Sequence, residues 1–140
     1  MMYRAGNRGA KALEDELVIL VVEDDPSIQA VVEDALSEGG FEPAIVASGE
    51  EAVTLLKGGQ TLYRALVIDI GLRGRMDGWE VAKLAREVDP ALPVVYITAA
   101  HADRWASQGV PDSVLLVKPF APAQLVTAVA QLLNTGPSTA

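Results

Sequence analysis

Five short apolar runs, rich in valine, isoleucine and leucine, recur along the chain and constrain its fold more than any other feature. The runs are Leu17–Val22, Pro43–Ala47, Ala65–Ile70, Pro93–Thr98 and Ser113–Val117. Most of them lack the alternation of apolar and polar residues that marks a half-exposed strand, and this pattern indicates strands buried on both faces of a parallel sheet. The longest unbroken run, Leu17–Val22, is far shorter than the roughly 20 residues needed to span a bilayer.

Segments with helical spacing and recognisable caps separate the apolar runs. Asp25 before Pro26 is typical of a helix start, and Gly39–Gly40 is typical of a helix end. Ser48 opens a second helix with capping-box spacing. Further helices are expected after Asp77–Gly78, over His101–Gln108 and over Ala121–Asn134. Apolar residues at helical steps include Ile28, Val31, Val32, Ala35 and Leu36 in the first helix, Val53, Leu55 and Leu56 in the second, and Val81, Leu84 and Val88 in the third.

The alternation of strands and helices predicts an α/β fold. Five strand–helix units with short connections favour right-handed crossovers and a doubly wound, five-stranded parallel sheet. Five units are too few for an eight-stranded barrel. We expect residues 17–134 to form one domain, with a polar tail over residues 1–16 and a second tail over residues 135–140.

Composition excludes several classes of site. The 140 residues include no cysteine, which excludes disulfides, iron–sulfur clusters, thiolate zinc sites and thiol catalysis. The single histidine leaves little material for a multi-histidine metal site. Lys and Arg number 11 against 19 Asp and Glu, for a net charge of −8. That acid excess disfavours binding to DNA or to an anionic membrane. Residues 1–16 are charged and carry no apolar targeting segment, so we expect a cytoplasmic protein.

Reactive polar residues stand at the ends of four of the five apolar runs. Glu23–Asp25, Asp69, Thr98 and Lys118 stand at these strand ends, where ligands bind in open α/β sheets. Carboxylates gathered there need a positive neighbour or a proton. An all-oxygen ligand set suits Mg²⁺, Mn²⁺ or Ca²⁺. A carboxylate beside Mg²⁺ can attack phosphorus and form an aspartyl phosphate, with lysine and threonine holding the phosphoryl oxygens.

Each of these residues also has a purely structural interpretation. Acidic residues favour helix N-termini, and Asp25 fits a capping role best. Thr98 alone is a good strand former, and Lys118 alone reads as a solvated lysine. Asp69 is harder to explain structurally, because a charge that closes a buried strand is costly. The arrival of all these groups at strand ends favours a functional site.

The order and spacing of these motifs closely resemble the receiver domain of two-component response regulators, in its single-domain, CheY-like form. The matching segments are Ile19–Asp25, Leu66–Asp69, Asp77–Val81, Pro93–Ala99 and Lys118–Phe120. The resemblance extends from about Leu17 to Leu133. It implies a flavodoxin-like fold with strand order 2-1-3-4-5.

The resemblance also implies a role for each motif residue. Asp69 would accept a phosphoryl group from a histidine kinase or a histidine phosphotransfer protein. The ligands of Mg²⁺, or of Mn²⁺, would be Glu23, Asp24, Asp69 and the backbone carbonyl of Gly71. Thr98 would be the switch hydroxyl, Lys118 would bind the phosphoryl group, and the bond before Pro119 would be cis.

The implied output is a change in protein binding or a relay of phosphate, without turnover of a substrate and without DNA or membrane binding. The expected surface for an unknown downstream protein contains Trp105, Val110 and Leu115. Two alternatives remain open. One is a small Mg²⁺-dependent aspartyl-phosphate phosphatase of the haloacid dehalogenase type, although Glu23–Asp25 lacks its Asp-x-Asp spacing. The other is a binding module that works without phosphorylation, which the complete residue set disfavours.

Three departures from the family pattern stand out. The loop Gly71–Met76 carries Arg73 where proline is usual, and it has one extra residue. Leu115 stands where the family has its switch aromatic residue. Gly71, Ala99 and Ala100 are small, so we expect the acyl phosphate to be exposed to water and short-lived. We expect His101 to be a solvated residue or a helix start.

Overall fold

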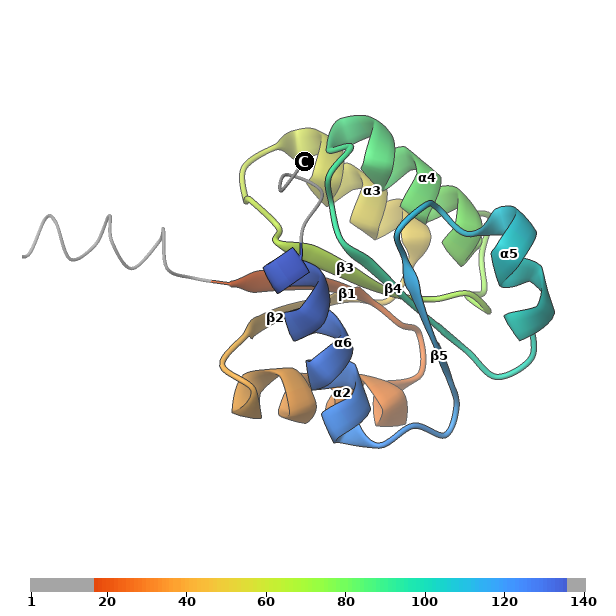
Figure 1. Ribbon diagram of the computed structural model, residues 1–140. Helices are drawn as coiled ribbons and strands as arrows, with labels where there is room; N and C mark the ends of the chain where they lie inside the picture. Colours follow the sequence, from red (N-terminus) through yellow and green to blue (C-terminus); the bar gives the residue numbers. More distant parts are fainter. Residues whose placement is uncertain (1–16, 136–140) are drawn as a thin grey trace, which may run out of the picture.

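The computed structural model describes residues 17–135, which form a five-stranded parallel sheet with helices on both faces (Figure 1). The strands are β1 (Val18–Val22), β2 (Glu42–Val46), β3 (Ala65–Asp69), β4 (Val94–Thr98) and β5 (Val114–Val117). Their order is β2-β1-β3-β4-β5. The predicted doubly wound, flavodoxin-like fold is confirmed, and each strand lies within one residue of its predicted bounds. The second tail was predicted to begin at residue 135, but Thr135 is the last residue of α6. Residues 1–16 and 136–140, the rest of the predicted tails, lie outside the described residues.

The helices occur where the sequence predicted them, with one change. They are α2 (Pro26–Glu38), α3 (Gly49–Gly58), α4 (Gly78–Val88), α5 (Trp105–Gln108) and α6 (Pro122–Thr135). The single helix expected over His101–Gln108 is instead a 3₁₀ turn, Ala102–Arg104, followed by the one-turn α5. Helices α2 and α6 cover one face of the sheet, and α3, α4 and α5 cover the other (Figure 1). None of the helices within residues 17–135 is long and apolar enough to cross a membrane.

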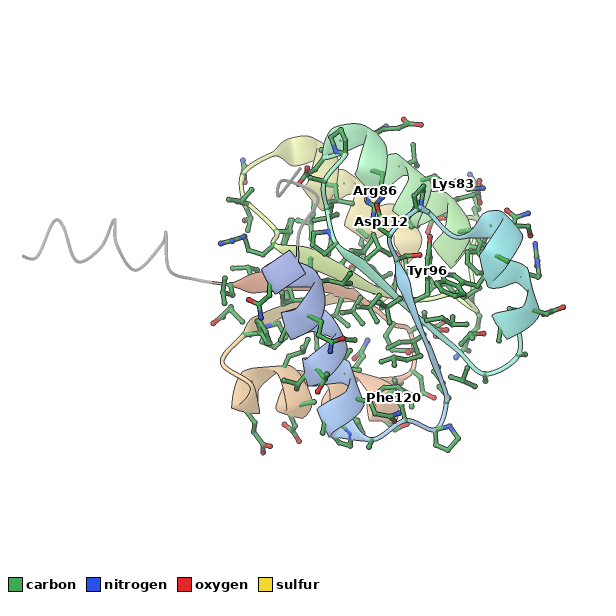
Figure 2. All side chains as sticks on the ribbon, in the orientation of Figure 1. Lys83, Arg86, Tyr96, Asp112 and Phe120 are labelled. Atoms are coloured by element: carbon green, nitrogen blue, oxygen red, sulfur yellow. The ribbon has the colours of Figure 1, made fainter. Side chains whose placement is uncertain are left out.

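The sheet separates two apolar cores. Alternate residues of β1 face opposite sides, so that Leu20 packs beneath α3 and α4 while Val21 packs beneath α2 and α6. Every residue of β3 and β4 is buried, which explains why these strands show no polar alternation. Tyr96, labelled in Figure 2, is fully buried in β4. The edge strands β2 and β5 are only partly covered, and Val117 is 49% exposed.

Side-chain caps begin three of the helices. The Asp25 carboxylate accepts a hydrogen bond from the Ser27 amide at 2.8 Å, and Ser48 accepts one from the Glu51 amide at 3.2 Å. Both predicted caps are therefore confirmed. Asp77 forms a complete capping box with Glu80, which sequence analysis did not identify.

Three residues that the sequence assigned to the apolar faces of helices are exposed in the structure. Val31 is 41% exposed, Leu55 is 39% exposed and Val88 is 49% exposed. Each lies at the border of its helix's apolar stripe. The sheet covers only one side of each helix, so residues at the border of the stripe extend into solvent.

Gly78 brings the first turn of α4 against the end of β3. A Cβ atom at this position would lie 2.7 Å from the Asp69 carbonyl oxygen and 2.8 Å from the Ile70 Cα. Both are backbone atoms and cannot rotate away. The close approach therefore requires glycine, and it fixes the position of α4 beside the strand end that carries Asp69.

Replacing Gly78 with alanine is expected to lower the free energy of unfolding by about 1–3 kcal/mol, because the added methyl group overpacks the backbone of β3. Urea denaturation followed by circular dichroism measures the change. Gly58→Ala is the matched control, since an added Cβ there meets no heavy atom within 4 Å. Equal stabilities of the two variants would show that the close approach carries no constraint.

Candidate functional site

Three carboxylates meet at the carboxyl ends of β1 and β3. Glu23 and Asp24 follow β1, and Asp69 is the last residue of β3. One oxygen from each carboxylate lies within 4.8 Å of the others. Glu23 is 1% exposed and Asp69 is 6% exposed. The predicted convergence of these residues at one edge of the sheet is confirmed.

Lys118 forms ion pairs with both buried carboxylates. Its Nζ atom lies 3.4 Å from Glu23 Oε1 and 3.4 Å from Asp69 Oδ2. Burial opposes the charge on this lysine, but attraction to Asp69 and then Glu23 outweighs burial and raises the pKa of Lys118 above its ordinary value. Lys118 therefore stays protonated, and a single ammonium group faces the cluster.

Backbone amides orient the carboxylates. The Asp25 amide donates to Glu23 Oε2 at 3.1 Å, and the Gly71 amide donates to Asp69 Oδ1 at 3.0 Å. Asp24 is held from the loop after β3, because Arg73 donates to its Oδ2 atom from both the backbone N–H and Nε. Sequence analysis missed the contact of Arg73 with Asp24. Its signal was the arginine at a position where the family usually has proline.

The charge balance of the cluster is incomplete without a further cation. Burial raises the pKa of Glu23 to about 7; the Asp25 amide opposes the shift, and the nearby Asp69 carboxylate adds to it. The buried site thus disfavours full ionisation of its own carboxylates. A divalent cation with oxygen ligands would relieve this repulsion, so the residues present fit Mg²⁺.

Thr98 ends β4 and is 1% exposed. Its hydroxyl oxygen accepts hydrogen bonds from the Ala100 amide at 3.2 Å and the His101 amide at 2.8 Å. No hydrogen bond among the described residues joins Thr98 to the carboxylates. The Lys118–Pro119 peptide bond is cis, the isomer predicted for it.

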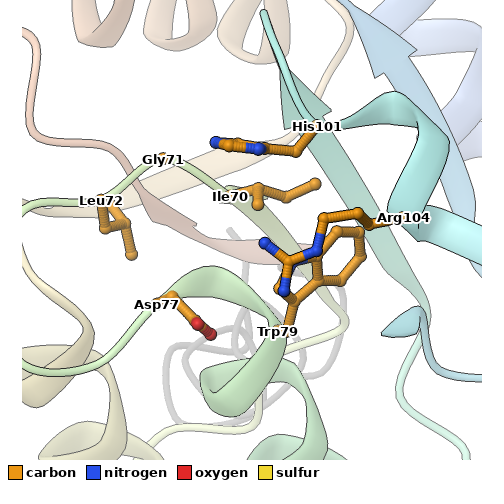
Figure 3. A pocket seen from close by; sticks show the side chains of 7 residues that line it. All are labelled: Ile70, Gly71, Leu72, Asp77, Trp79, His101 and Arg104. Carbon is orange, nitrogen blue, oxygen red and sulfur yellow. The ribbon is translucent and has the colours of Figure 1, made fainter. Parts of the chain in front are cut away.

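A hollow adjoins the residues that follow Asp69 (Figure 3). It is lined by Ile70, Gly71, Leu72, Asp77, Trp79, His101 and Arg104. Figure 3 shows His101 and Arg104 reaching across it from the segment after β4. Gly71, Ala99 and Ala100 are exposed, and His101 is partly buried. The small residues are therefore exposed, whereas Asp69 itself is 6% exposed.

The surface expected to bind a partner is only partly exposed. Trp105 is half-buried, and its Nε1 donates to Ser113 Oγ at 2.9 Å. Leu115 is also half-buried. Val110 is 8% exposed and belongs to the core, and its amide donates to the Tyr96 hydroxyl at 3.0 Å. The prediction that Val110 is a surface residue is wrong. The hydrogen bond from its amide to the buried Tyr96 side chain holds Val110 in the interior.

Glu23→Gln is expected to raise the melting temperature in metal-free buffer, and by more at pH 8 than at pH 4.5. The folded pKa of Glu23 lies above the unfolded value, so wild type loses stability from this group as the pH rises from about 4.5 to about 7. Glutamine stays neutral and avoids that loss. Differential scanning calorimetry at both pH values measures it, with Glu33→Gln on the exposed side of α2 as control. A gain that is independent of pH would contradict the assignment.

Comparison with curated proteins identifies relatives in mycobacteria. The chain is 38% identical over 121 residues to the transcriptional regulatory protein TcrA of Mycobacterium tuberculosis, covering 85% of this chain and 47% of that protein. It is 36% identical over 124 residues to the transcriptional regulatory protein PrrA of Mycobacterium bovis, covering 87% and 52%. The chain therefore spans about half the length of these curated relatives.

Solved structures share the fold. A response regulator receiver protein from Sinorhizobium medicae is 45% identical with a TM-score of 0.84, over 86% of this chain and 97% of that one. The receiver domain of the sensor histidine kinase PA1611 from Pseudomonas aeruginosa, which holds a magnesium ion in its active site cleft, is 26% identical with a TM-score of 0.73, over 85% and 98%. Residues 19–130 match the family described as the response regulator receiver domain. The chain therefore belongs to the family of response regulator receiver domains.

Proposed function

We propose that this domain accepts a phosphoryl group on Asp69, from a histidine kinase or a histidine phosphotransfer protein, in a Mg²⁺-dependent reaction. The observation that carries the proposal is the cluster of Glu23, Asp24 and Asp69, whose carboxylate oxygens lie within 4.8 Å while Lys118 contacts two of them. The magnesium ion in the related receiver domain of PA1611 supports it.

The metal ligands in this proposal are Glu23, Asp24, Asp69 and the backbone carbonyl of Gly71. Their hard oxygen atoms suit Mg²⁺ and would also accept Mn²⁺. When bound, the cation supplies positive charge that offsets the carboxylates and the oxygens of an incoming phosphoryl group. Asp24 and Glu23 would hold the ion, with the Arg73 backbone amide orienting Asp24 and the Asp25 amide orienting Glu23.

Asp69 is the nucleophile in this proposal. It is the carboxylate that belongs to a strand, as the last residue of β3, whereas Glu23 and Asp24 follow β1. A bond forms between its carboxylate oxygen and phosphorus as the phosphorus–nitrogen bond of the donor phosphohistidine breaks. The freed imidazole nitrogen takes up a proton. Lys118 Nζ already lies 3.4 Å from Asp69 Oδ2 and stays protonated, so it balances the charge that the phosphoryl group brings.

The switch in this proposal is the segment between β4 and α5. The Thr98 hydroxyl oxygen accepts from the Ala100 and His101 amides, and in this proposal it leaves these partners and turns toward a phosphoryl oxygen on Asp69. That movement releases two amides and repositions the chain leading to Trp105. The change in protein binding would then occur on a surface that includes Trp105 and Leu115.

The domain acts as a switch or a phosphate relay in the cytoplasm, and its output partner is a protein of unknown identity. In this proposal the phosphoryl group on Asp69 is itself the signal, and no separate substrate is turned over. The net charge of −8 disfavours direct binding of this domain to DNA phosphates or to an anionic membrane.

Incubation with acetyl phosphate and Mg²⁺ is expected to add one phosphoryl group to the wild-type protein and none to Asp69→Asn. The amide cannot form the acyl phosphate, although it keeps the size of the side chain. Intact-mass spectrometry reads the product. Asp34→Asn, an exposed position on α2, is the matched control and should accept the group normally.

Other outcomes of the same experiment favour the alternative functions. Failure of the wild type to gain mass from any donor would indicate a binding module that works without phosphorylation. Steady hydrolysis of a generic phosphate ester that survives Asp69→Ala would indicate a phosphatase with another nucleophile. Either result would overturn the proposal.

Gly71→Leu is expected to lengthen the half-life of the phosphorylated protein severalfold. A Cβ atom at position 71 would lie 3.8 Å from Asp69 Oδ1, an ordinary contact, so a larger side chain can cover the acyl phosphate and exclude water. Intact mass followed over time after donor removal measures the loss. Gly58→Leu, on α3 where an added Cβ meets nothing within 4 Å, should decay like wild type. An unchanged or shorter half-life in Gly71→Leu would show that shielding at this position does not limit hydrolysis.

A further inference from the structure

The loop between β3 and α4 places an arginine on one of the three clustered carboxylates. Arg73 Nε lies 3.2 Å from Asp24 Oδ2, and the Arg73 backbone N–H donates to the same oxygen at 3.0 Å. The two residues are 49 positions apart in the sequence. The proposed phosphoryl transfer uses Asp24 but gives the side chain of Arg73 no role.

Asp24 is the carboxylate of the cluster that Lys118 does not contact. Lys118 pairs with Glu23 and Asp69, and within residues 17–135 the cation paired with Asp24 is Arg73. The side chain of Asp24 is 17% exposed, whereas that of Arg73 is 83% exposed. An ion pair this exposed contributes little to stability, so the guanidinium can leave without disturbing the packing of the domain.

We infer that the side chain of Arg73 is a displaceable competitor of the divalent cation at Asp24. The inference rests on the proposed function, because it takes Asp24 as a ligand of that cation. A guanidinium and a divalent cation that share one carboxylate repel each other, whichever oxygen the cation takes. Arg73 therefore lowers the affinity of the site for Mg²⁺, and loading of the site releases the Arg73 side chain from Asp24.

The backbone of the loop has anchors that do not depend on the Arg73 side chain. The Arg73 amide still reaches Asp24, and the Arg75 amide donates to Glu50 Oε2 at 3.2 Å. Gly74 between them has φ of 111°, a conformation that side chains rarely adopt. Truncating Arg73 thus removes the guanidinium while these contacts hold the loop in place.

Arg75 offers a matched control on the same loop. It is exposed and carries the same charge, yet its side chain forms no ion pair within the described part of the chain. Arg73→Ala and Arg75→Ala change the net charge equally. A difference between them reports the contact with Asp24 and excludes a general effect of charge.

Isothermal titration calorimetry of the unphosphorylated protein with MgCl₂ tests the inference. Arg73→Ala is expected to bind Mg²⁺ roughly two- to fivefold more tightly than wild type, the factor that matches the free energy of an exposed ion pair. Arg75→Ala should bind close to wild type, and Arg73→Lys should fall between wild type and Arg73→Ala. The difference should shrink in high salt, because salt screens the competing charge.

The outcomes separate this inference from the proposed function. Equal affinities of Arg73→Ala and wild type, or weaker binding by the variant, would overturn the competition while leaving the Mg²⁺ site intact. Equal gains in Arg73→Ala and Arg75→Ala would also overturn it, because the effect would then be one of net charge. Absence of Mg²⁺ binding in every variant would overturn both the inference and the proposed metal site.

Discussion

The repulsion among three clustered carboxylates, only partly offset by Lys118 and Arg73, is the constraint on which the site depends. Glu23 and Asp69 are almost fully buried, and the single ammonium group of Lys118 contacts both at 3.4 Å. The cost of burying these charges is visible in the raised pKa of Glu23. The same negative charge that makes the carboxylates repel one another also attracts a further cation to the site.

The parallel sheet explains why these residues meet. Strands β1 and β3 are neighbours, with Val22 opposite Ile68, so the next residues of the two strands, Glu23 and Asp69, emerge side by side. Lys118 leaves β5, two strands from β3. Its amide is held by the Thr98 carbonyl at 2.8 Å, and its long side chain covers the remaining distance. Close contact at Gly78 fixes α4 against the same edge.

The loop after Asp69 connects the charge cluster to the protein surface. It contributes one amide to Asp69 and, through Arg73, two donors to Asp24. Its other anchor, Glu50 on α3, lies on a different element. Arg73 and the proposed cation both bind the Asp24 carboxylate. Occupancy of the site by the cation and the conformation of the exposed Arg73 side chain are therefore linked.

The sequence by itself determined the fold, because local properties of the chain decide it. Unbroken apolar runs favour strands buried on both faces, as β3 and β4 are, and capping residues such as Asp25 and Ser48 act on their own helix ends. The same logic placed the site residues at strand ends. Tertiary structure decided what depends on distant partners: the burial of Val110 under Tyr96, the exposure of Val31 and Val88, the amides that hold Thr98, and the contact of Arg73 with Asp24. Local spacing specifies elements, whereas contacts between residues far apart in the chain depend on strand register and loop path, which no short segment encodes.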